Sequence, residues 1–79
     1  MYEDLKNIDL NNLPFKTTIG DFTFIIAERP APNINPFVIM KNKKLGLNKV
    51  ISSPDVADEA GYACLIKLTY ELFENRKDD

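Results

Sequence analysis

The stretch that decides the fold is Pro54–Lys77, PDVADEAGYACLIKLTYELFENRK, and its apolar spacing predicts one long helix. Ser53 can cap this helix, and the proline fits its first turn. The acidic residues Asp55, Asp58 and Glu59 complement the positive end of the helix dipole. They lack the spacing and glycine of a calcium loop, so the dipole explains them without a metal ion. The sequence therefore predicts a capped helix that starts at Pro54.

Apolar side chains occupy two faces of the predicted helix. We expect the first stripe to lie on a sheet, and it comprises Ala57, Gly61, Cys64, Leu65, Leu68 and Leu72. The second stripe, about 100° further round the helix, comprises Tyr62, Ile66 and Phe73. The chain has no histidine to activate its lone cysteine, so we expect Cys64 to be a buried core thiol. Because one stripe can cover a small sheet, the second predicts a further contact.

Two different elements could cover the second stripe. Residues 2–13 predict a short helix with apolar residues three apart, which could pack there within the same chain. A second molecule is the alternative, because a domain this small is thinly stabilised, and one cysteine with no histidine supplies neither a disulfide nor a zinc site. This alternative predicts a homodimer or a bound protein target. Its expected interface residues are Tyr62, Ile66, Tyr70 and Phe73.

The middle of the chain predicts two β-hairpins. Gly20 and Asp21 suit a two-residue hairpin loop, and Lys41–Lys44 form a second polar turn. Three prolines in Arg29–Pro36 indicate an extended connection between the hairpins. The four expected strands span 15–19, 22–28, 37–40 and 45–52. The sequence thus predicts a single α+β domain over 1–79, in which a short N-terminal helix precedes a four-stranded antiparallel sheet and the long C-terminal helix packs on one sheet face.

Lysines concentrate around the second hairpin. The four residues of this predicted patch are Lys41, Lys43, Lys44 and Lys49. Such lysines can simply solvate a turn or discourage pairing at a sheet edge. They could instead contact phosphates or an acidic partner, and this second interpretation predicts a nucleic-acid-binding accessory protein. A net charge of -2 over the whole chain gives no general attraction to nucleic acid.

Composition and motifs narrow the function further. The sequence contains no phosphate-binding glycine loop, nucleophile elbow or dinucleotide fingerprint, so we expect no catalytic residues and no cofactor. The acidic N-terminal residues are unlike a signal peptide, and no apolar run is long enough for a bilayer. We therefore expect a cytoplasmic, non-catalytic accessory or regulatory protein without a membrane partner. The abundance of Lys, Asn and Ile indicates an AT-rich genome, such as that of a low-GC bacterium or its phage, and we expect a phage or mobile-element type of accessory factor.

Overall fold

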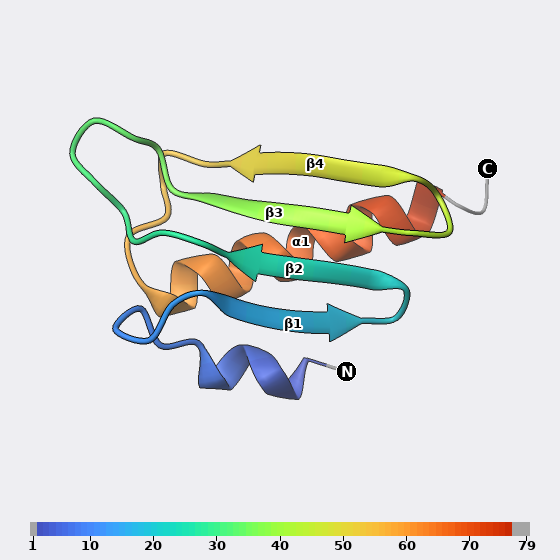
Figure 1. The fold of residues 1–79 in the computed structure, drawn as a ribbon, viewed down its shortest axis with the longest axis horizontal. Helices are drawn as coiled ribbons and strands as arrows, with labels where there is room; N and C mark the ends of the chain where they lie inside the picture. The colour runs from blue at the N-terminus through green and yellow to red at the C-terminus, as the bar shows by residue number, and fades with distance from the viewer. Residues whose placement is uncertain (1, 77–79) are drawn as a thin grey trace.

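A four-stranded antiparallel sheet and one long helix form the fold (Figure 1). The structure is a computed structural model that describes residues 2–76. Its strands follow the order β1-β2-β3-β4, and α1 lies across one face of the sheet. The predicted α+β class is therefore confirmed. The elements are η1 (Glu3–Asn7), β1 (Phe15–Ile19), β2 (Phe22–Ile26), β3 (Phe37–Asn42), β4 (Leu47–Ser52) and α1 (Glu59–Arg76).

Two tight turns set the register within the β1–β2 and β3–β4 hairpins. Gly20 has φ +59° in the β1–β2 turn, a conformation that glycine adopts without steric cost. Strand β3 continues two residues beyond the predicted end, so the second turn follows Asn42 rather than Met40. There the side-chain oxygen of Asn42 accepts a hydrogen bond from the backbone N–H of Leu45 at 3.1 Å. This local bond shapes the turn. Lys41 remains in the strand, where it pairs with Thr23 of β2 and Asn48 of β4.

The N-terminal segment forms a shorter helix than predicted. Only Glu3–Asn7 is helical, as a 3₁₀ turn, and Leu5, Ile8 and Leu10 are buried against the core. A short isolated helix is marginal in water, so these apolar contacts hold the segment in place. The hydroxyl of Thr17 on β1 donates to the Asp4 carboxylate at 3.4 Å. Thus η1 lies alongside the outer edge of β1 (Figure 1).

The long helix begins five residues later than predicted. Its first residue is Glu59, and the Asp58 carboxylate caps it by accepting a hydrogen bond from the N–H of Gly61 at 2.9 Å. The hydroxyl of Ser53 instead accepts from the N–H of Asp55 at 3.3 Å, which closes a local turn around the proline. The predicted start signal at Ser53 therefore marks a turn. Asp58, the next acidic residue after Asp55, caps the helix instead.

The predicted orientation of α1 is wrong. Tyr62 and Ile66 are fully buried against the sheet, whereas Leu68 and Leu72 are 59% and 60% exposed. Cys64 is also exposed, so it is not the predicted core thiol. Both stripes are apolar, but the second contains the aromatic residues Tyr62 and Phe73, and aromatic side chains bury more surface per residue.

The tyrosines of α1 contact groups on the sheet and in the N-terminal segment. The hydroxyl of Tyr62 donates to the backbone carbonyl of Glu28 at 3.2 Å, and burial raises the pKa of this hydroxyl above its ordinary value of 10.0. The ring of Tyr70 packs edge-on against Phe22, with centroids 5.7 Å apart. On its other side, Tyr2 of the N-terminal segment meets Tyr70 edge-on at 6.1 Å. A helix turned the other way would lose these contacts.

The four residues predicted as an interface lie mostly on the sheet-facing side of α1. Tyr62, Ile66 and Tyr70 belong to the core, and Phe73 is half-buried against it. Tyr62 and Ile66 are fully buried, and Tyr2 of the N-terminal segment packs against the neighbouring Tyr70. Of these four side chains, only Phe73 is more than marginally exposed.

Candidate functional site

The face of the sheet opposite α1 carries no covering element in residues 2–76. In Figure 1 the helix lies behind the strands, so this open face is turned towards the viewer. Strand pairing places Lys16 opposite Ile25, Ile25 opposite Ile39, and Ile39 opposite Val50. These four side chains form one row across all four strands, which we call the central row. Ile25 and Ile39 are half-buried and Val50 is 65% exposed.

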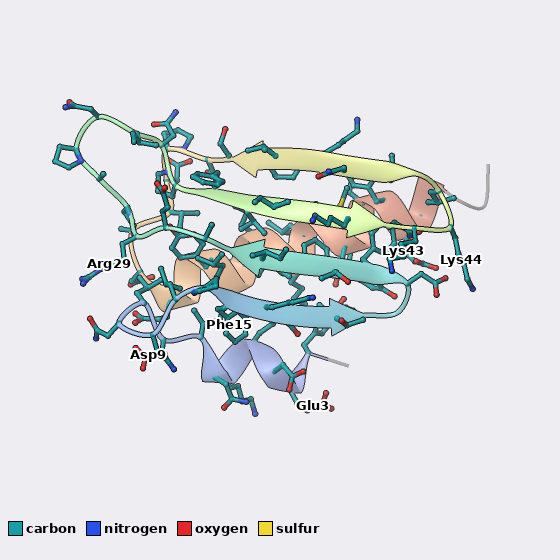
Figure 2. All side chains as sticks on the ribbon, viewed as in Figure 1. Glu3, Asp9, Phe15, Arg29, Lys43 and Lys44 are labelled. Carbon is teal, nitrogen blue, oxygen red and sulfur yellow. The ribbon has the colours of Figure 1, made fainter. Side chains whose placement is uncertain are left out.

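A basic hollow lies at one end of the open face. It has a volume of about 470 Å³ and is lined by Lys16, Asp21, Thr23, Ile25, Lys41, Lys43 and Lys44. Lys43 and Lys44 come from the turn between β3 and β4 (Figure 2). Four lysines and one aspartate leave a formal charge of +3 on this lining, although the whole chain carries -2. The charge of the hollow is thus opposite in sign to that of the molecule.

The ion pair within the hollow is weak. The ammonium of Lys44 lies 3.4 Å from a carboxylate oxygen of Asp21, and the lysine side chain is 76% exposed. Exposed pairs of this kind contribute about 0–1 kcal/mol, because water screens them and both side chains lose freedom. An incoming anion can therefore compete for Lys44 at little cost.

The structure brings together three of the four lysines predicted as a patch. Lys41, Lys43 and Lys44 line the hollow, whereas Lys49 lies on the helix side of the sheet. Its ammonium is 5.8 Å from the ring centroid of Phe73 on α1, an arrangement that favours a cation–π contact. The inclusion of Lys49 in the patch is therefore wrong, because side chains alternate between faces along β4.

Sequence reasoning missed Lys16. This residue comes from the first hairpin, far from the lysine cluster in the sequence, and reaches the hollow because β2 pairs with β3. Its position opposite Ile25 follows from the tight β1–β2 turn. The alternation of side chains along β1 places Lys16 on the open face. This predicts a position near the other lysines only once the order of the strands is known.

The chemistry of this surface suits binding. Among residues 2–76, no three His, Cys, Asp or Glu side chains gather closely enough to hold a metal ion. Cys64 lies on the other side of the molecule, in a shallow groove between α1 and the segment that precedes it. The open face instead offers positive charges beside aliphatic side chains, which is a combination that recognises anions carrying apolar groups.

Comparisons with known proteins add no family to this picture. No protein-family model, curated protein or solved structure matches the chain. Within the described part of the chain, no helix has the length and apolar character needed to cross a bilayer. The open face is therefore the feature from which a function can be argued.

Proposed function

We propose that this chain is a non-catalytic accessory protein that binds an acidic segment of another protein on the open face of its sheet. The observation that carries the proposal is the central row of Ile25, Ile39 and Val50 beside a hollow of charge +3. Aliphatic side chains bury apolar surface of a partner, and the lysines select carboxylates and speed up encounter. We place the protein in the cytoplasm, where the exposed thiol of Cys64 stays reduced.

An acidic protein segment fits this surface better than a nucleic acid does. Single-stranded nucleic acids bind through aromatic side chains on which bases stack, together with a basic groove. The lining of the hollow contains no aromatic residue, and Phe37 lies at the far end of β3. Nucleic-acid binding through Lys41, Lys43 and Lys44 is thus the competing function, and it lacks a stacking platform.

The dimensions of the central row indicate the length of the bound segment. Three strand spacings separate Lys16 from Val50, which amounts to about 14 Å. An extended segment of about five residues spans this distance. The proposed ligand therefore carries both carboxylates and aliphatic residues within a short extended stretch. The accessory role in a phage or mobile element is part of the same proposal.

Fluorescence anisotropy distinguishes the two functions. A labelled ten-residue peptide of alternating glutamate and valine is expected to bind about tenfold more tightly than a ten-nucleotide oligothymidine at equal salt, a difference of about 1.4 kcal/mol. A peptide with lysine in place of glutamate serves as the matched control and is expected not to bind, because like charges repel. Tighter binding of the oligonucleotide would instead support the nucleic-acid function.

A further inference from the structure

The free edge of β4 differs from the opposite edge of the sheet. The segment η1 flanks the edge of β1, and Asp4 there accepts a hydrogen bond from Thr17. Strand β4 is the last strand at its side, and no other described element lies beyond it (Figure 1). A bare edge presents unpaired backbone groups that can pair with another strand.

The backbone groups on this edge can be identified from the register. The N–H of Ser53 donates to the carbonyl of Pro36 at 3.1 Å, and β3 and β4 are antiparallel. Because backbone groups in an antiparallel strand alternate in direction, the odd-numbered residues of β4 bond to β3. Asn48, Val50 and Ser52 therefore direct their N–H and carbonyl groups outward. None of these three residues is charged or is a proline.

We propose that two copies of this chain pair antiparallel along β4, with Val50 of each copy on the two-fold axis. Sheet continuation through outward-facing residues then places Asn48 of one copy opposite Ser52 of the other. Polar residues meet polar residues, and the apolar pair meets at the centre. The edge is thus complementary to itself, which is what a two-fold interface requires.

Neighbouring registers fit less well. A shift in one direction places Lys49 opposite Lys49 of the second copy, and directly opposed like charges destabilise a sheet. A shift in the other direction leaves Val50 opposite the polar Ser52. In the proposed register Lys49 lies opposite Ile51, whose aliphatic side chain suits the lysine stem. The register with Val50 on the axis is therefore the favoured one.

Exposure of Val50 supports a second copy as the occupant. At 65% it is the most exposed of the large apolar side chains in residues 2–76. Val50 also ends the central row, because it has a neighbour in Ile39 on one side and none on the other. Pairing of two copies would join the two central rows into one that crosses eight strands. Lys49 does not block the edge, since its ammonium lies over Phe73 on the helix side.

Light scattering over a micromolar concentration series tests the dimer without any ligand. The wild-type mass is expected to approach twice the 9.0 kDa of one chain. Val50→Lys places two like charges on the axis and is expected to give the single-chain mass with an unchanged circular dichroism spectrum. Thr18→Lys adds the same charge to the open face of β1 and is expected to remain dimeric. A wild-type monomer, or a dimeric Val50→Lys variant, would overturn the proposal.

Cysteine cross-linking tests the register independently. In a Cys64→Ser background, cysteines replace Asn48, Val50 or Ser52 one at a time. Directly opposed residues of a hydrogen-bonded pair have Cα atoms about 5.5 Å apart, which lies within the range for disulfides. Val50→Cys is expected to form the covalent dimer at least about tenfold faster than the other two. Fastest cross-linking at position 48 or 52 would overturn the register. Neither experiment depends on the binding of an acidic segment, so the two proposals can fail separately.

Discussion

The Ile66→Asp variant is expected to be unfolded at 25 °C. Ile66 is fully buried on the face of α1 that packs against the sheet. The substitution removes core packing and buries a carboxylate without a partner, and together these effects cost more than about 4 kcal/mol. A single hydrophobic core in a domain of this size rarely supplies more than about 3–5 kcal/mol of stability, so the loss exceeds what the fold can absorb. Circular dichroism and urea unfolding are the measurements.

Leu72→Asp is the matched control on the opposite flank of the same helix. Leu72 is 60% exposed, so the same change of residue is expected to alter the free energy of unfolding by only about 0.5 kcal/mol. A folded Ile66→Asp protein together with an unfolded Leu72→Asp protein would show that the helix is turned the other way. The pair of variants therefore reports the orientation of α1 directly.

Hydrophobic spacing predicted the presence of the long helix but not the face that it buries. Two apolar stripes compete for the sheet, and periodicity favoured the stripe with more residues, which is the more exposed one in the structure. Tertiary contacts decide between the two stripes. The Tyr62 hydroxyl donates to the carbonyl of Glu28, and Tyr70 packs against Phe22 beside the β1–β2 turn. These partners are distant in the sequence, so no local pattern contains them.

Strands and site were predictable to different degrees. The first hairpin follows from a tight turn between two β-rich runs, and its strand β1 matches the predicted bounds. Lys41, Lys43 and Lys44 lie close in the sequence and were predicted together. Predicting that Lys16 lines the hollow requires knowing that β2 pairs with β3. Predicting that Lys49 does not line it requires knowing to which face β4 turns each side chain. Proximity in the sequence thus predicted which lysines gather around the β3–β4 turn, but not which face of the sheet each lysine occupies.

Charge reversal in the hollow is expected to have the largest effect on binding. Lys16→Glu combined with Lys41→Glu changes the formal charge of its lining from +3 to -1, since each reversal subtracts two. The affinity for the glutamate–valine peptide is expected to fall about a hundredfold, or about 2.7 kcal/mol, because like charges now oppose the carboxylates. Anisotropy titration at low and high salt measures the loss, and wild-type affinity is expected to weaken with added salt.

A second double variant controls for net charge. Lys6→Glu combined with Lys49→Glu changes the total charge equally, but both residues lie away from the open face. Its peptide affinity is expected to stay within about twofold of the wild type, because distant exposed charges are screened. Equal losses in both double variants would mean that only overall charge matters and that the hollow has no special role.

The most direct test of the account is the footprint of the glutamate–valine peptide on the backbone amides of the protein, measured by two-dimensional ¹⁵N NMR. The open face is expected to show the largest shift changes, along the central row from Lys16 to Val50 and at Lys41. Amides of Cys64, Leu68 and Leu72 on the exposed flank of α1 are expected to stay unchanged. A footprint on that helical flank, with the central row unperturbed, would contradict the assignment of the open face as the binding surface.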